Sequence, residues 1–282
     1  MSHETLPRPP QHLYGIIGHP LGHTLSPTIH NWGFARHGLD AVYMAWPLPP
    51  GKVADFVQAA RTLPIAGASV TIPHKETILG LVDHVTATAS AVGAVNTLYW
   101  RDGVLHGDNT DLEGFIAPLQ RAGMAATPPA TAMVLGAGGA ARAVIAGLKT
   151  LGVGRVIVTN RTPERAQALA RAFDVDCVPW EERTHCNAAC VVNTTPLGMH
   201  GEREAETPWP AAAFAQGMIA YDIVYNPLRT RFLREAAAAG CAVCDGLDMF
   251  MAQAAAQFRL WTGLDLDPAA GRAVLLAALG AA

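Results

Sequence analysis

A lysine and an aspartate, each near the start of an expected helix, are the residues best suited to acid–base chemistry. Lys75 follows the strand-like segment 66–72, and we expect a helix to begin at Pro73. In the first turn of that helix the dipole would disfavour an ammonium ion and so favour its use in proton transfer. Asp111 ends the segment 107–111, and its carboxylate could align Lys75 with a substrate hydroxyl. Each residue by itself is equally compatible with a structural role, as an exposed lysine or as an acid that stabilises a helix N-terminus.

Two pairs of hydroxyls could bind a polar substrate. Thr24 and Ser26 precede an expected helix and could hold the carboxylate or hydroxyls of a small molecule. Ser26 stands before Pro27, however, and a serine before a proline is also a common way to cap a helix. In the strand before Lys75, alternation places Ser69 and Thr71 on one face and apolar side chains on the other.

A glycine-rich turn follows a short strand and begins a helix. It consists of Gly136, Ala137, Gly138, Gly139 and Ala140. In a dinucleotide site the first glycine makes the turn and the second lets the backbone approach the pyrophosphate. A small third residue, here Ala141, lets the helix pack closely on the strand. The surrounding strand–turn–helix pattern favours a dinucleotide site over a plain connection between a strand and a helix.

The next strand ends without the acid that an NAD site usually has there. In its place stand Asn160, Arg161 and Thr162, with Arg165 one turn into the following helix. Guanidinium groups suit a 2′-phosphate because they can donate paired hydrogen bonds to it. The sequence therefore favours NADP as cofactor. The alternative is that both arginines belong to a solvated helix start.

Alternating strands and helices position these groups and predict an α/β fold. The first part has strand candidates at 14–18, 42–46 and 66–72, and residues 101–103 predict a hairpin between two further strands. A mostly parallel sheet with an antiparallel strand follows from this order. The proline-rich stretch 125–131 is the best candidate for a linker between two domains. A second series of strands and helices follows it and ends in a long amphipathic helix at 245–261 and a short last helix.

The composition excludes several classes of protein. Of 282 residues, 20 are basic and 23 acidic, and the net charge of -3 provides no basic surface for nucleic acid. Apolar runs stop short of the roughly 18 residues of a membrane helix, and the first residues do not resemble a secretory signal. Five cysteines indicate a reducing, cytoplasmic setting. Cys241 and Cys244 would face opposite sides of a strand, which argues against a metal or redox pair.

Taken together, the motifs resemble the shikimate dehydrogenase family, which includes quinate dehydrogenases. The resemblance extends in family order from Tyr14 to Trp261. It is carried by the segments 23–27, 70–75, 93–97, 107–111, 136–140, 160–162, 193–199, 221–225 and 245–249. Singly these motifs are weak, whereas jointly they are specific.

The resemblance implies a reversible, NADP-dependent reduction of 3-dehydroshikimate to shikimate in aromatic amino acid biosynthesis. By position, Lys75 and Asp111 correspond to the catalytic pair. The positions that correspond to substrate contacts are Thr24, Ser26, Thr71, Asn96, Tyr225 and Gln253. The positions that correspond to cofactor contacts are Gly136, Ala137, Gly138, Gly139, Ala140, Asn160, Arg161, Thr162, Arg165, Ile223 and Gly246. The resemblance also implies an N-terminal, mostly parallel α/β substrate domain of residues 1–112 and 247–282, and a Rossmann-type NADP-binding domain of residues 113–246.

Two departures from the family pattern leave the substrate open. Thr24 replaces a common serine, and Ser69 replaces a frequent asparagine, which removes two amide donors. Quinate and amino-substituted shikimate therefore stay as alternative substrates. A methylenetetrahydrofolate dehydrogenase and a non-catalytic NADP sensor are further alternatives, although a folate site would need a long aromatic slot. A small-molecule substrate is the expected partner, with a homodimer through Leu275, Leu276 and Leu279 as one option.

Overall fold

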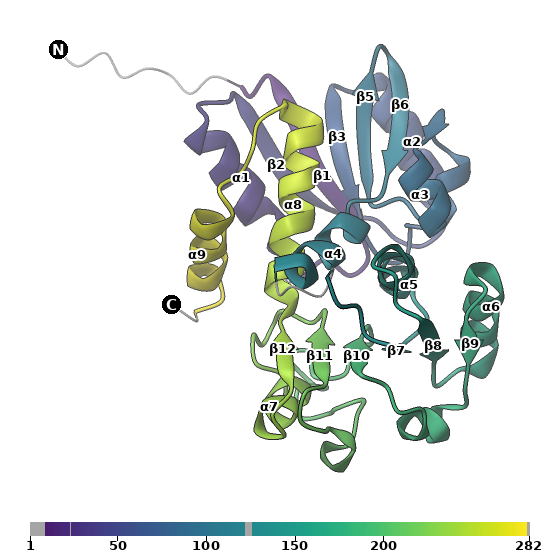
Figure 1. Ribbon diagram of the computed structural model, residues 1–282. Coiled ribbons are helices and arrows are strands. Elements are labelled where there is room, and N and C mark those ends of the chain that lie inside the picture. Colours follow the sequence, from purple (N-terminus) through teal and green to yellow (C-terminus); the bar gives the residue numbers. More distant parts are fainter. Residues whose placement is uncertain (1–8, 23, 122–125, 281–282) are drawn as a thin grey trace.

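The computed structural model describes residues 9–22, 24–121 and 126–280, which form two α/β halves (Figure 1). Each half is built on a six-stranded sheet. Helices α4 and α5 lie where the two halves meet, and α8 runs from the second half back along the first (Figure 1). The predicted α/β class is confirmed.

The first half contains one antiparallel strand in an otherwise parallel sheet, as the sequence predicts. The order is β2-β1-β3-β5-β6-β4, and β5 alone runs against its neighbours. The strands are β1 (His12–Gly18), β2 (Ala41–Pro47), β3 (Ile65–Val70), β4 (His84–Val85), β5 (Thr97–Arg101) and β6 (Val104–Asp108). The helices are α1 (Ser26–Arg36), α2 (Val53–Thr62), α3 (Ala87–Val92), α4 (Asp111–Arg121) and the 3-10 turn η1 (Thr77–Gly80).

The second half has an entirely parallel sheet. The order is β12-β11-β10-β7-β8-β9, so the connections change direction between β7 and β10, where this class of sheet binds ligands. The strands are β7 (Thr131–Leu135), β8 (Arg155–Thr159), β9 (Asp176–Cys177), β10 (Cys190–Asn193), β11 (Ile219–Asp222) and β12 (Ala242–Cys244). The helices of this half are α5 (Gly139–Thr150), α6 (Pro163–Phe173), η2 (Trp180–His185), η3 (Ala211–Ala213) and α7 (Arg231–Ala238). The last two helices, α8 (Gly246–Thr262) and α9 (Pro268–Ala278), follow β12 and pack on the first half.

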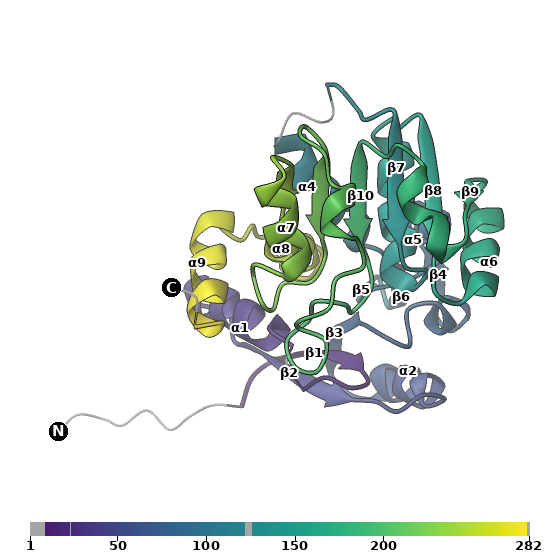
Figure 2. The ribbon, with the colours of Figure 1, turned by 90° about the horizontal axis from the view of Figure 1, so that it is seen from below.

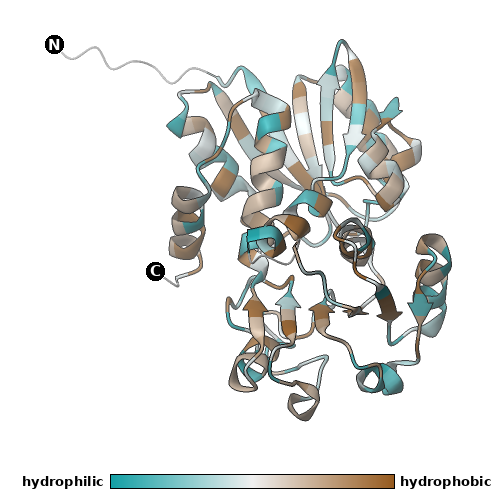
Figure 3. Ribbon diagram, in the orientation of Figure 1, coloured by the Kyte–Doolittle hydropathy of each residue, from teal (hydrophilic) through white to brown (hydrophobic). Residues whose placement is uncertain are grey.

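Both sheets are covered by apolar side chains on both faces, as parallel sheets require. Along β1, Tyr14 and Ile16 face one core while Ile17 faces the other. Along β7, Val134 and Met133 likewise face opposite cores. Figure 3 shows the hydrophobic residues gathered along the strands of the second sheet. No helix in the described ranges is long and apolar enough to cross a membrane.

The last helix packs against its own chain. Figures 1 and 2 both show α9 beside α1, and Leu275 is fully buried there. Leu276 and Leu279 pack against the same core. These three leucines therefore pack within the chain itself, and a homodimer through them stays a prediction.

The helix expected to begin at Pro73 is absent. In such a helix the carbonyl of Lys75 would accept a bond from the next turn, but here it accepts from the backbone N–H of Val95 at 2.8 Å. His74 donates its backbone N–H to the Thr71 carbonyl, which closes a turn. The buried ring of His74 is held by the Leu48 carbonyl at 2.8 Å. Lys75 therefore lies in a turn after β3, and the predicted influence of a helix dipole on it is wrong.

A histidine is buried in the core of the first half. His30 has no exposed surface, and its ring stacks on Tyr43 with the centroids 4.6 Å apart. Neither ring nitrogen has a hydrogen-bond partner in the described part of the chain. Burial lowers the pKa of His30 from 6.5 to about 3, so the folded protein holds this imidazole neutral.

We predict that His30 makes folding less favourable as the pH falls below 6.5. The unfolded chain takes up a proton near pH 6.5 and the folded chain does not, so the stability contributed above that pH is lost on acidification. Between pH 7 and pH 5 the loss amounts to about 2 kcal/mol. Urea unfolding of the wild type and of His30→Phe at both pH values measures it. Equal pH dependence in the two proteins would contradict the prediction.

Candidate active site

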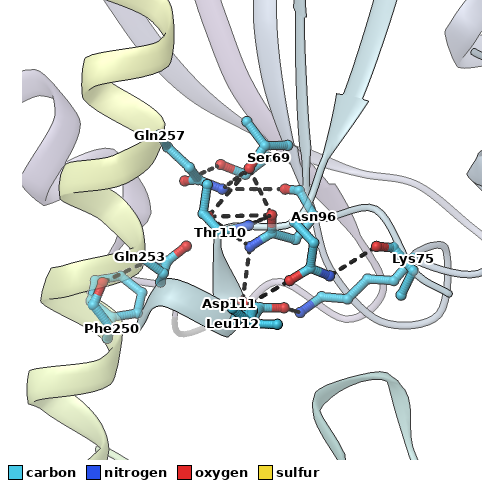
Figure 4. A network of polar contacts seen from close by, with 12 residues as sticks. Ser69, Lys75, Asn96, Thr110, Asp111, Leu112, Phe250, Gln253 and Gln257 are labelled. Atoms are coloured by element: carbon cyan, nitrogen blue, oxygen red, sulfur yellow. Dashed lines mark hydrogen bonds and ion pairs between the residues drawn. The ribbon is translucent and has the colours of Figure 1, made fainter. Parts of the chain in front are cut away.

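Lys75 and Asp111 form a nearly buried ion pair. Nζ of Lys75 lies 2.6 Å from Oδ2 of Asp111, and their side chains are 13% and 9% exposed. Lys75 comes from the turn after β3, whereas Asp111 is the first residue of α4, where the helix dipole favours a carboxylate. Figure 4 shows the two side chains pointing toward one another from opposite sides. The structure thus brings together the two residues predicted to transfer the proton.

Asn96 fixes the other oxygen of this carboxylate. Its Nδ2 donates to Oδ1 of Asp111 at 2.8 Å and to the Thr110 hydroxyl at 3.0 Å. Its Oδ1 accepts from the backbone N–H of Thr110 and from the hydroxyl of Thr97. Asn96 is buried and its amide is fully engaged within the protein, although it stands at a position predicted to contact substrate.

Thr24 and Ser26 lie together at the start of α1. The hydroxyl of Thr24 donates to that of Ser26 at 3.2 Å, and its oxygen accepts from the Ser26 backbone N–H at 3.3 Å. The N-cap residue of α1 is Leu25, with no side-chain capping bond. The interpretation of Ser26 as an N-cap is therefore wrong, and its hydroxyl is not committed to capping.

Ser69, which replaces the family's asparagine, uses its hydroxyl inside the protein. Its Oγ accepts from the Tyr43 hydroxyl at 2.6 Å and donates to Oε1 of Gln257 at 2.8 Å. The neighbouring Thr71 lies in the turn after β3, held by a backbone bond to the Ile17 carbonyl. Ser69 is thus a link between β2 and α8.

Tyr225 and Gln253 reach this region from the second half and from α8. The Tyr225 ring packs against Phe250 at a centroid distance of 5.0 Å, and burial raises the pKa of its hydroxyl. Nε2 of Gln253 donates to the Phe250 carbonyl at 2.9 Å. Packing of α8 on α4 is close, because a Cβ at Gly114 would overlap Gln253 and the Met249 carbonyl.

The glycine-rich turn has the form that a dinucleotide requires. Gly136 has φ +113 and lies so close to Thr194 that a side chain there would collide with it. Gly138 is the N-cap of α5 without a side-chain capping bond, and a Cβ there would meet nothing within 4 Å. The first backbone N–H groups of α5 therefore face open space, which suits a pyrophosphate. Ala141 is fully buried, as the close packing of helix on strand requires.

Lys75 passes beside this turn. A Cβ built on Gly139 would lie 3.4 Å from Cδ of Lys75, so the lysine stem lies between the aspartate and the glycine-rich turn. A cavity of about 590 Å³ opens there, lined among others by Lys75, Gly138, Gly139, Arg142 and Arg165. Lys75 and the glycine-rich turn therefore line one cavity where the two halves meet.

Two arginines beside the start of α6 have no acidic partner among the described residues, and Arg165 also lines the cavity beside Lys75. Arg161 and Arg165 are exposed, and within the described residues neither pairs with a carboxylate. The side chain of Asn160 donates to the Thr162 carbonyl at 3.0 Å and so shapes the turn before α6. Thr162 is the N-cap of α6, as the sequence predicts, but its side chain makes no capping bond. A pocket of about 230 Å³ is lined by Asn160 and Arg161.

Ile223 and Gly246, 23 positions apart in the sequence, touch in the fold. A Cβ on Gly246 would overlap the Ile223 carbonyl, so only glycine fits at the start of α8. Asp222, just before Ile223, is buried and accepts bonds from Thr230, Asn193 and the Val224 backbone. Burial raises the pKa of Asp222 to about 7.

Sequence reasoning assigned no role to four residues of the polar cluster around Asp111, part of which Figure 4 shows. They are Tyr43, Thr97, Thr110 and Gln257. One signal was available, because Gln257 lies one helical turn after Gln253 and directly before the apolar Phe258. The other three carry no pattern that separates them from ordinary strand and loop residues.

The cysteines carry no metal or redox cluster. All five are free, and no group of three potential metal ligands occurs among the described residues. Burial raises the pKa of Cys190 to about 12 and that of Cys244 to about 11, which disfavours reactive thiolates.

Comparison with known proteins agrees with this geometry. Family models match the chain as a shikimate dehydrogenase substrate binding domain at residues 16–98, a shikimate/quinate 5-dehydrogenase at 121–192 and a shikimate 5'-dehydrogenase C-terminal domain at 246–276. A shikimate dehydrogenase (NADP(+)) of Oleidesulfovibrio alaskensis is 54% identical over 98% of both chains. The chain belongs to the shikimate dehydrogenase family. The family predicted from the sequence motifs is thereby confirmed.

Solved structures of the family have the same fold. The shikimate 5-dehydrogenase of Thermus thermophilus, in complex with NADP(H) and shikimate, is 41% identical with a TM-score of 0.84 and covers 94% of this chain and 99% of its own. A quinate dehydrogenase of Corynebacterium glutamicum, in complex with NAD, is 31% identical with a TM-score of 0.87 and covers 94% and 98%. The chain is therefore more similar to the shikimate dehydrogenase (NADP(+)) of Oleidesulfovibrio alaskensis, at 54% identity, than to this quinate dehydrogenase, at 31%.

Proposed function

We propose that this protein catalyses the reversible, NADP-dependent reduction of 3-dehydroshikimate to shikimate, a step of aromatic amino acid biosynthesis. The observation that carries the proposal is the Lys75–Asp111 pair, 2.6 Å between charged atoms and beside Gly139 of the glycine-rich turn. The names of the relatives at 54% and 48% identity, shikimate dehydrogenase (NADP(+)), support the substrate and the cofactor.

Lys75 acts as the general acid in the reduction and as the general base in the reverse reaction. When bound, the reduced nicotinamide supplies the hydride that the carbonyl carbon receives. Nζ of Lys75 donates a proton to the ketone oxygen as it gains negative charge, and in the reverse direction takes the proton from the hydroxyl. Asp111 orients the ammonium group and stabilises its charge through the 2.6 Å contact. Asn96 keeps the carboxylate in that orientation.

The remaining polar groups hold a small polyol acid. Thr24 and Ser26 offer adjacent hydroxyls that suit its carboxylate. Thr71, Tyr225 and Gln253 supply further donors and acceptors, and Asn96 too corresponds to a substrate contact in the family pattern. Hydroxyl and amide groups in this number suit a substrate with several hydroxyls.

The second half holds NADP. The turn at 136–140 and the first N–H groups of α5 receive the pyrophosphate. Arg161 and Arg165, with Asn160 and Thr162, receive the 2′-phosphate. Ile223 and Gly246, which touch in the fold, would line the end of the site beside the nicotinamide, as their positions in the family pattern imply.

Domain limits, compartment and assembly complete the proposal. Residues 1–112 with 247–282 form the substrate domain, and residues 113–246 form the NADP domain. Five free cysteines are typical of a reducing cytoplasm. A homodimer, with the half-buried Leu276 and Leu279 of α9 as one candidate surface, stays a prediction.

We predict that shikimate with NADP is the best substrate pair. Absorbance of the reduced nicotinamide, followed with shikimate and quinate, each with NADP and NAD, measures this. Faster turnover of quinate would move the protein to the quinate alternative. Binding of NADP without any substrate-dependent absorbance change would indicate the non-catalytic sensor.

We predict that Lys75→Ala lowers kcat by about 100- to 10,000-fold, because the general acid is lost. Lys52→Ala is the control, since Lys52 is an exposed lysine whose ion pair with Asp55 lies outside the cleft. Steady-state oxidation of shikimate measures both variants. Near-wild-type turnover of Lys75→Ala would remove the assigned role.

We predict that Arg161→Ala raises the KM for NADP by about 10- to 100-fold, since a charged hydrogen bond contributes ~1.5–3 kcal/mol. The KM for NAD should change little, because NAD has no 2′-phosphate. Arg171→Ala, near the C-terminal end of α6, whose start lies just after Arg161, is the control. Equal losses for both cofactors would exclude Arg161 as a 2′-phosphate contact.

A further inference from the structure

A buried chain of hydrogen bonds joins Gln257 of α8 to the carboxylate of Asp111. Nε2 of Gln257 donates to the Thr97 hydroxyl at 3.0 Å, and this hydroxyl donates to Oδ1 of Asn96 at 2.7 Å. Nδ2 of Asn96 then donates to Oδ1 of Asp111 at 2.8 Å. Gln257 is 1% exposed and Thr97 is fully buried, so water does not replace these partners (Figure 4).

Two backbone groups fix the direction of every bond in this chain. Nε2 of Gln257 also meets the Asn96 carbonyl at 3.2 Å, and a carbonyl can only accept, so the amide nitrogen must lie on that side. The backbone N–H of Thr110 meets Oδ1 of Asn96 at 2.8 Å, and an N–H can only donate. Neither amide can therefore rotate without leaving buried polar groups unpaired, which is costly.

The outer end of the chain is equally well defined. Oε1 of Gln257 accepts from Ser69, whose oxygen in turn accepts from the Tyr43 hydroxyl. The titratable side chains near Gln257 are Tyr43 and the neutral His30. Burial raises the pKa of Tyr43, so its hydroxyl stays uncharged and donates to Ser69 at the outer end of the hydrogen-bond chain.

We propose that Gln257 is a positioning residue for the acid–base pair. It acts through Thr97 and Asn96, which hold Oδ1 of Asp111 and so aim Oδ2 at Nζ of Lys75. The inference rests on the proposed reaction, because it assigns Gln257 to the proton-transfer step. Gln257 itself touches neither Lys75 nor Asp111. Replacing it should therefore lower kcat more than it raises the KM for shikimate, because it changes the orientation of the acid–base pair.

The test compares Gln257→Met with Trp261→Phe. Methionine keeps the length of the side chain but loses the three hydrogen bonds of the amide. The kcat for shikimate oxidation should therefore fall about 10- to 100-fold, the cost of a slightly misplaced catalytic group. The KM values for shikimate and NADP should stay within about three-fold of wild type. Trp261, one turn further along α8, donates to the Leu98 carbonyl at 2.9 Å outside this chain. Trp261→Phe should lower the melting temperature comparably without the loss of kcat.

A second variant, Gln257→Glu, adds a signature that general destabilisation does not produce. The protonated carboxyl has one donor and one acceptor and can replace the amide toward Thr97 and Ser69, whereas the ionised form has no donor. Burial raises the pKa of such a carboxyl. The ratio of its kcat to the wild-type kcat should therefore fall as the pH rises. The corresponding ratio for Gln257→Met should not change with pH.

The outcomes separate this inference from the proposed function. A wild type without NADP-dependent oxidation of shikimate would overturn the proposed function. An active wild type with a folded Gln257→Met variant of unchanged kcat would overturn only the role of Gln257. Should Gln257→Met fail to fold, Gln257→Glu decides: a falling kcat ratio supports the role, and a ratio independent of pH overturns it.

Discussion

The structure depends on an ammonium–carboxylate contact that is almost sealed from water. Burying Lys75 and Asp111 removes the hydration of both charges, and one direct contact seldom compensates fully for that loss. The protein adds a fixed amide, Asn96, on the second carboxylate oxygen and places Asp111 where a helix dipole favours it. The pair therefore exists because several elements of the first half converge on one point.

The way the chain returns from the second half explains how the cleft is completed. After β12, helix α8 leaves the second sheet and packs on α4 and on the first sheet. It carries Gln253 and Gln257 to the neighbourhood of Asp111, while the start of α5 stands beside Lys75. Both halves therefore contribute to one site, as expected when a dinucleotide must meet a substrate.

A buried polar network accounts for the departure from the family pattern at Ser69. Its hydroxyl accepts a hydrogen bond from Tyr43 and donates one to Gln257, and Gln257 in turn donates to Thr97. Such a network is stable only when every member is paired, and here each of its groups has a partner. Ser69 therefore holds Tyr43 and Gln257 in place, and no polar group of this network lacks a partner although the family's asparagine amide is absent.

The sequence alone predicted the α/β pattern, the hairpin at Asp102 and Gly103 and the dinucleotide turn, because each rests on local chemistry. The choice of Lys75 and Asp111 as acid–base pair came from the resemblance to the family, since either residue by itself is equally compatible with a structural role. Only the tertiary structure decided that the segment at Lys75 is a turn, since a distant N–H, that of Val95, takes the carbonyl a helix would need. It also decided that Gln257 belongs to the site. Hydrogen bonds between residues up to 188 positions apart carry no periodic signal in the sequence, so only packing reveals them.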